Sequence, residues 1–109
     1  VMIMTSAEKE ANDTVQKLGE QYPKFMAAFN RFMQESSKEG AIDEKTKELI
    51  AIAVSVSKQC KWCIHLHVKK AMELGATKDE IMESSFVSTL MGGGPALMYI
   101  QEVMKALEE

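Results

Sequence analysis

The 109-residue chain has few turn-forming residues, with only 2 prolines and 6 glycines, and aromatic residues make up only 6% of it. This scarcity disfavours a β-sandwich, in which many short strands are joined by tight turns. No apolar run approaches the roughly 20 residues that a membrane-spanning helix needs. The net charge is −3, whereas a nucleic-acid-binding protein normally presents a basic face. We therefore expect a helical protein that neither crosses a membrane nor binds nucleic acid.

The remaining composition is that of one folded domain. Apolar residues make up 46% of the chain and charged residues 27%, which excludes a disordered protein. The length suits a single domain over residues 1–109. Residues 1–4 are apolar but too few for a signal-peptide core, and no basic leader precedes them, so we expect a cytoplasmic protein. Thiols stay reduced there, and a close cysteine pair is then more often redox-active or metal-binding than structural.

Helix signals divide the chain into about six helices with short connections. Pro23 suits a first helical turn, Asp43 is a good N-cap, and residues 77–80 have the sequence of a capping box. The expected helices cover about residues 7–18, 23–39, 44–56, 59–74, 78–90 and 96–107. The third and fourth are expected to lie antiparallel as a central pair. This apolar load in so short a chain also favours burial against other subunits.

The third segment also shows a strand-like pattern. Ile50, Ile52, Val54 and Val56 alternate with small residues, as in a buried strand. We favour a helix, because no other segment offers a partner strand. A helix that is apolar nearly all round is also typical of a buried central helix.

The residues that could carry chemistry lie between positions 60 and 67. Cys60, Cys63 and His67 are spaced i, i+3 and i+7, so on a helix their side chains share one face. Cys60 is expected in the first turn, where unpaired N–H groups and the helix dipole favour a thiolate. His67 follows Cys63 by one turn and can accept its proton. This pattern predicts a reactive dithiol.

Glu48 is expected to complete this group. If the chain reverses near Lys58, Glu48 precedes the turn by about as many residues as His67 follows it. At roughly 1.5 Å per residue, the two side chains then lie level on antiparallel helices. A carboxylate there would orient the imidazole and raise its basicity, giving a relay of Glu48, His67 and Cys63.

Two other interpretations of the cysteine pair stay open beside the favoured redox dithiol. The cysteines could be buried apolar residues, or they could bind zinc with His67 and His65. Structural zinc usually takes its ligands from two separated pairs, and the chain has no other cysteine or histidine. His65 is more typical of a surface or packing residue, and Trp62 is expected to shape access to the thiols.

Two further segments are interpreted as structural. Residues 92–95, Gly-Gly-Gly-Pro, lack the Lys-Ser/Thr of a phosphate loop and predict a tight junction between helices. The last helix carries a charged face that we expect to be solvated. That face consists of Glu102, Lys105, Glu108 and Glu109.

Together these motifs resemble the carboxymuconolactone decarboxylase superfamily, in particular its alkylhydroperoxidase D-like branch. The resemblance rests on residues 48–55, on Cys60-x-x-Cys63-x-x-x-His67, and on residues 92–96, and it covers about residues 39–107. It implies an all-α, homo-oligomeric protein, commonly a trimer or hexamer. The implied activity is thiol-dependent reduction of hydroperoxides in an antioxidant role, or disulfide reduction, with no cofactor or metal.

The resemblance also implies a role for each site residue. Cys63 matches the peroxidatic cysteine, Cys60 its disulfide partner, and Glu48 and His67 the proton relay. The reductant of the best-known branch is a lipoyl-bearing dithiol protein. The chain departs from the pattern at Trp62, where the branch carries a histidine, and His65 is the candidate replacement.

Three alternatives to the peroxidase remain. A disulfide reductase or redox sensor would use the same dithiol but ignore peroxides. A non-catalytic helical oligomer would be indifferent to replacement of the cysteines. Lactone decarboxylation is disfavoured, because the decarboxylase branch generally lacks this cysteine pair.

Overall fold

The computed structural model describes residues 4–108, and Glu109 of the expected charged face lies outside them. Within this range the protein is all-α and contains no strand, so the strand-like segment is helical. The elements are α1 (Ser6–Gln21), α2 (Pro23–Ser37), α3 (Glu44–Ser57), α4 (Lys61–Glu73) and α5 (Lys78–Leu107). None of the helices in residues 4–108 combines the length and apolarity that a bilayer crossing requires.

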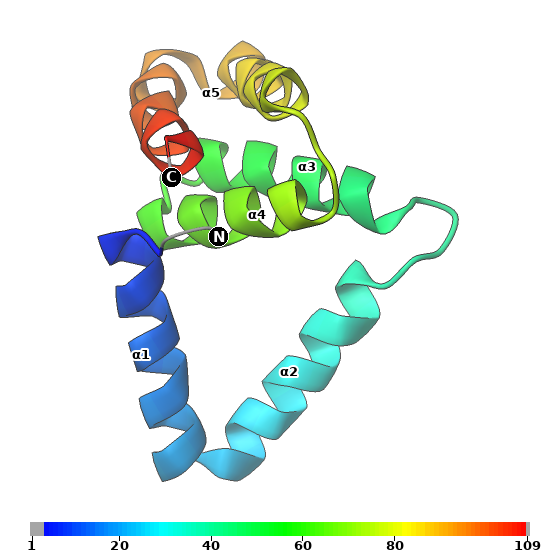
Figure 1. The fold of residues 1–109 in the computed structure, drawn as a ribbon, viewed down its shortest axis with the longest axis vertical. Helices are drawn as coiled ribbons and strands as arrows, with labels where there is room; N and C mark the ends of the chain where they lie inside the picture. The colour runs from blue at the N-terminus through cyan, green and yellow to red at the C-terminus, as the bar shows by residue number, and fades with distance from the viewer. Residues whose placement is uncertain (1–3, 109) are drawn as a thin grey trace.

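The helices form two parts, a body of α3, α4 and α5 and an arm of α1 and α2 (Figure 1). α3 and α4 lie antiparallel, and α5 packs over both of them, which confirms the expected central pair (Figure 1). α1 and α2 diverge from the turn that joins them. The N-terminal end of α1 contacts α4, and the C-terminal end of α2 leads into the loop before α3 (Figure 1). The N-terminal end of α1 is therefore placed against the helix that carries the cysteine motif.

Short polar side chains fix where most helices begin. Thr5, Asp43 and Thr77 accept hydrogen bonds from the backbone N–H three residues later, as N-caps do. The bond from the Thr46 N–H to Asp43 holds the pKa of that carboxyl below its usual range. Thr5 thus caps α1. α4 begins two residues later than expected, because Gln59 is left-handed at a φ of 58°.

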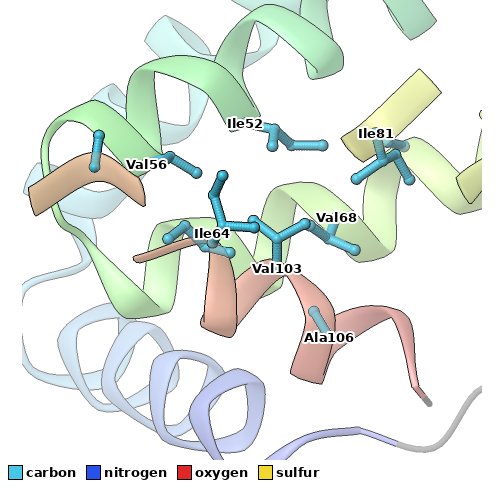
Figure 2. Close-up of a cluster of buried hydrophobic side chains, with 10 residues drawn as sticks. Ile52, Val56, Ile64, Val68, Ile81, Val103 and Ala106 are labelled. Carbon is cyan, nitrogen blue, oxygen red and sulfur yellow. The ribbon is translucent and has the colours of Figure 1, made fainter. Parts of the chain in front are cut away.

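The core lies where α3, α4 and the two halves of α5 meet. Branched aliphatic side chains from all of them converge there with no exposed surface (Figure 2). Its largest members are Ile52, Val56, Ile64, Val68, Ile81 and Val103. Each fully buried side chain of this size contributes on the order of 1.5–3 kcal/mol, and together they set the register between α3 and α4.

α5 is bent at the glycine-rich segment, so its halves correspond to the last two expected helices. Gly93 has a φ of 68° and a ψ of −154°, which a residue with a side chain rarely adopts. Pro95 follows in the first turn of the second half, where its missing N–H costs no helical hydrogen bond. The predicted tight junction is confirmed.

We expect Gly92→Ala to destabilise the protein by about 1–3 kcal/mol through overpacking. A Cβ at Gly92 would lie 2.8 Å from the Ala96 Cβ and 3.4 Å from the Ser57 Oγ. Gly94→Ala is the matched control, because a Cβ there meets nothing within 4 Å. Urea unfolding of the two variants measures the difference. Equal stabilities would show that the junction is not tightly packed.

Candidate active site

The turn between α3 and α4 places Cys60 at the N-terminal end of α4. Gln59 is left-handed, and the Cys60 N–H donates to the Ser55 carbonyl at 3.1 Å, which closes the turn. Cys60 is then the N-cap of α4, and its sulfur accepts a hydrogen bond from the Cys63 N–H at 3.3 Å. Cys60 is expected inside the first turn, but it lies at the N-cap, directly before that turn.

Cys60 and Cys63 are joined by a disulfide, with their Cα atoms 5.3 Å apart. Both residues are only partly buried, so the bond lies near the surface at the N-terminal end of α4. The pair can therefore exist as a disulfide without rearrangement of the helix. A bond between cysteines three residues apart closes a very short loop, and it constrains the unfolded chain less than a long loop would.

Glu48 and His67 are in contact across α3 and α4, as the antiparallel register predicts. The Glu48 carboxylate oxygen lies 2.7 Å from His67 Nδ1. Glu48 is buried at 5% exposure, whereas the His67 side chain is 39% exposed. Since the ionised carboxylate accepts the hydrogen bond, Nδ1 carries the proton, and Nε2 is left as the basic nitrogen. His67 lies one turn after Cys63, and its side chain is partly exposed to solvent.

His65 is buried on the opposite side of α4 and forms a second carboxylate–imidazole pair. Its Nε2 lies 2.9 Å from Glu102, and its Nδ1 lies 2.8 Å from the Thr5 hydroxyl. Its exposure is only 4%. Both ring nitrogens are thus engaged in contacts that join α4 to α5 and α1, so His65 acts as a packing residue and is not placed to replace the missing relay histidine.

Glu102 is largely buried, contrary to the expectation that it lies on a solvated face of the last helix. Lys105 and Glu108 of that face are exposed, but the Glu102 side chain is only 15% exposed. Burial raises the pKa of the Glu102 carboxyl, but the hydrogen bond from His65 and the charge of Lys105 outweigh it, and the pKa lies below its usual value. The helical periodicity alone could not reveal this, because His65 is 37 residues away.

We expect Glu102→Gln to lower the free energy of unfolding by about 1–2 kcal/mol at pH 7, since it weakens a charge-assisted hydrogen bond. Because the pKa of Glu102 is lower in the folded chain, its ionised carboxylate stabilises the fold at pH values above the ordinary pKa of 4.5. This stability is lost as the pH falls through the folded-state pKa. The gap between wild type and variant should therefore narrow below about pH 4. Thermal unfolding at pH 7 and pH 3 measures it, and a gap that widens in acid would contradict the account.

Trp62, between the cysteines, is tied to α1. Its indole Nε1 donates to the Glu10 carboxylate at 2.8 Å, and the Lys61 ammonium lies 5.2 Å from its ring centroid. The side chain is still 47% exposed. The ring is therefore held in one orientation at the surface, between the two cysteines in the chain, and its expected effect on access to the thiols stays a prediction.

A further buried contact between α1 and α4 escaped sequence reasoning. The Glu8 carboxylate, 4% exposed, pairs with Lys69 at 2.6 Å. The hydrogen bond that the Lys69 ammonium donates to Glu8 raises the pKa of Lys69. α1 therefore holds α4 at three points through Thr5, Glu8 and Glu10, residues with no local signal of their partners.

The histidine and cysteine side chains of the site are engaged with other side chains. Within residues 4–108, no three His, Cys, Asp or Glu side chains are grouped so as to hold a metal ion. Each histidine ring binds a carboxylate, and the two sulfurs bind each other. The site therefore combines a partly exposed disulfide with a carboxylate–imidazole pair in an all-helical protein.

The chain belongs to the carboxymuconolactone decarboxylase family, whose sequence pattern matches residues 23–106. It is 34% identical over 95 residues to an uncharacterised protein of Cupriavidus necator, covering 87% of this chain and 84% of that one. An uncharacterised protein of the cox locus of Paracoccus denitrificans is 44% identical over 71 residues. That match covers 65% of this chain, and it spans 64% of the Paracoccus protein.

Solved structures show the same fold. A carboxymuconolactone decarboxylase family protein from Legionella pneumophila superposes with a TM-score of 0.89 at 40% identity, covering 94% of this chain and 91% of that one. A family protein from Thermotoga maritima, for which a part in the antioxidative response has been suggested, gives a TM-score of 0.80 at 24% identity. That match covers 91% of this chain and 85% of the Thermotoga protein. The expected family and the all-α fold are confirmed.

Proposed function

We propose that the protein is a thiol-dependent peroxidase that reduces organic hydroperoxides in an antioxidant role. The observation that carries this proposal is the Cys60–Cys63 disulfide one turn before His67, whose ring is held by the buried Glu48 carboxylate. A carboxylate that orients an imidazole near a thiol is a general way to activate a nucleophilic cysteine. The role suggested for the Thermotoga protein points the same way, although that likeness by itself shows the fold alone.

The proposed reaction starts from the reduced dithiol. His67 accepts the Cys63 proton, and the thiolate attacks the terminal oxygen of the hydroperoxide, ROOH. The O–O bond breaks, the proton held by His67 passes to the leaving alkoxide to give ROH, and Cys63 becomes a sulfenic acid. The Cys60 sulfur then attacks the Cys63 sulfur, which forms the disulfide and releases water. Two electrons from the dithiol thus reduce one hydroperoxide.

The cycle needs two electrons from an external thiol to restore the dithiol. A dithiol or lipoyl-bearing protein is the reductant that the family resemblance suggests. A reducing compartment such as the cytoplasm would keep this donor available. No metal or cofactor takes part in the proposed cycle.

A comparison of substrates tests the proposal against the disulfide-reductase alternative. With a dithiol donor in excess, the protein is expected to consume cumene hydroperoxide faster than it reduces a small aromatic disulfide. Hydroperoxide loss and thiolate release are followed separately in matched assays. Turnover of the disulfide without turnover of the hydroperoxide would replace the peroxidase by a disulfide reductase of the same fold.

We also propose that the protein assembles from copies of itself, as a trimer or hexamer. On α2 only Met26 is buried, and large apolar side chains are exposed on this helix and around the bend of α5. These are Phe25, Phe29, Phe32 and Met33 on α2, and Phe86, Val87, Leu90 and Met91 on α5. Groups of large exposed apolar side chains such as these are typical of subunit interfaces.

Leu90→Glu is expected to dissociate the assembly, because Leu90 is 80% exposed in the single chain and a charge there would be buried between subunits. Light scattering coupled to gel filtration measures the mass. A wild-type protein that runs as a single chain at micromolar concentration would contradict the proposed assembly.

A further inference from the structure

A cavity of about 400 Å³ lies beside the α3–α4 turn, on the side of α4 that faces α5. Its lining consists of Gln59, Lys61, Trp62, Tyr99, Gln101 and Glu102. Neither Glu48 nor His67 belongs to this lining, because both lie on the side of α4 that packs against α3. The volume is in the range of small-molecule sites and is far too small for a folded partner.

The walls of this cavity have the chemistry to bind a small anionic molecule with amide groups. Trp62 and Tyr99 supply aromatic surface, and Gln59 and Gln101 supply amide donors and acceptors. Both oxygens of the Glu102 carboxylate are engaged, one by His65 and one by Lys105.

Lys61 gives the cavity its available positive charge. The ion pairs formed within residues 4–108 do not include the Lys61 ammonium, which lies over the Trp62 ring. A carboxylate bound in the cavity could therefore pair with Lys61 without displacing another carboxylate of the described chain.

The cavity is lined by the residues on either side of Cys60, but neither cysteine belongs to its lining. Gln59 and Lys61, the two chain neighbours of Cys60, both line it. The Glu48–His67 pair lies beyond Cys63 on the other face of α4. The cavity and the Glu48–His67 pair therefore lie on different sides of the α4 N-terminus.

We propose that this cavity binds a carboxylate-bearing, peptide-like thiol of low molecular mass, and that this thiol reduces the disulfide by attack at Cys60. The thiolate bonds to the Cys60 sulfur, the Cys60–Cys63 bond breaks, and Cys63 leaves as a thiolate. A second thiol attacks the ligand sulfur of this mixed disulfide and releases Cys60. Two thiols are oxidised to one disulfide, and the protein gains two electrons and two protons. The inference rests on the redox cycling of the pair in the proposed function.

Binding is measured through Trp62, the only tryptophan in the chain. S-methylglutathione is the probe, because it carries carboxylates and amides but no reactive thiol. Titration at fixed ionic strength is expected to change the Trp62 fluorescence saturably. Lys61→Gln should weaken binding by about tenfold, which corresponds to about 1.4 kcal/mol.

Lys58→Gln is the matched control for this titration. Lys58 is an exposed lysine in the same turn, but it does not line the cavity. It should leave the binding unchanged. No saturable signal in the wild type, or equal weakening by both substitutions, would overturn the proposal.

A second measurement separates recognition of the thiol from a general effect on the sulfurs. Reduction of the disulfide by glutathione and by uncharged 2-mercaptoethanol is followed without hydroperoxide. Lys61→Gln should slow reduction by glutathione about tenfold more than reduction by 2-mercaptoethanol. Equal slowing of both would show that Lys61 acts on the sulfurs and would overturn the cavity as a thiol site. A disulfide that no thiol reduces would instead contradict the redox function itself.

Discussion

Replacing Cys63 by serine is expected to abolish hydroperoxide turnover, with a loss of at least about 10³-fold in rate. Serine keeps the size and position of the side chain, but its hydroxyl is not deprotonated by an imidazole in the absence of substrate and does not form a stable bond to peroxide oxygen. Hydroperoxide consumption with a dithiol donor measures the loss, and circular dichroism checks that the helices remain. Retained turnover would remove Cys63 from the proposed mechanism.

Cys60→Ser is the matched control for this experiment. It leaves Cys63 and His67 in place, so one hydroperoxide should still be reduced per chain, with a sulfenic acid left on Cys63. No intramolecular disulfide can then form. If neither the sulfenic acid nor its trapped adduct is found, the proposed order of the two cysteines is wrong.

Glu48→Gln is expected to lower the rate of hydroperoxide reduction by about 10²-fold, in the range found for positioned acid–base groups. The amide keeps the shape of the side chain, but it removes the negative charge from the group that lies 2.7 Å from His67 Nδ1. The imidazole then loses the partner that fixes its tautomer and its orientation. The effect should fall on the formation of the sulfenic acid, measured in a single turnover, and not on the later closure of the disulfide.

Glu8→Gln is the control for loss of a buried carboxylate. Glu8 also pairs with a side chain of α4, Lys69, but this pair joins the arm to the body and lies away from the Glu48–His67 contact. It should reduce stability without a comparable change in the single-turnover rate. Equal losses of rate in the two variants would mean that Glu48 acts through the fold and not through His67.

The fold could be predicted in large part because its signals are local. N-caps such as Asp43 and Thr77, together with Pro23, mark where helices begin, and each acts within one turn of its own position. The bend at Gly93 was visible for the same reason, since residues 92–94 are three consecutive glycines. The start of α4 was missed because it depends on the left-handed Gln59, which no pattern in the sequence requires.

The site was predictable only where helix geometry connects its parts. The Glu48–His67 contact follows from the spacing of both residues about a single turn, once α3 and α4 are antiparallel. The contacts of His65 and Trp62 with α1 join residues 60 and 52 positions apart, and their formation depends on how the arm is placed. Nothing in the local sequence of α1 indicates that placement.

Trp62 remains the main difference from the expected relay. The Trp62 indole N–H donates to Glu10. Because an indole nitrogen can donate but not accept a hydrogen bond, Trp62 cannot take up and pass on a proton at neutral pH. His65 does not take over this part, because its ring is engaged by Thr5 and Glu102. The proposed proton relay therefore consists of Glu48 and His67 alone.

The central claim is that Cys60 and Cys63 form a dithiol that hydroperoxide oxidises directly. The protein is reduced, freed of reductant and mixed with one equivalent of cumene hydroperoxide, and its thiols and mass are followed beside the Cys63→Ser variant. We predict rapid loss of both thiols, a mass decrease of about two hydrogens and one equivalent of the product alcohol, with none of these changes in the variant. Unreacted thiols that a small alkylating reagent still reaches would contradict the account.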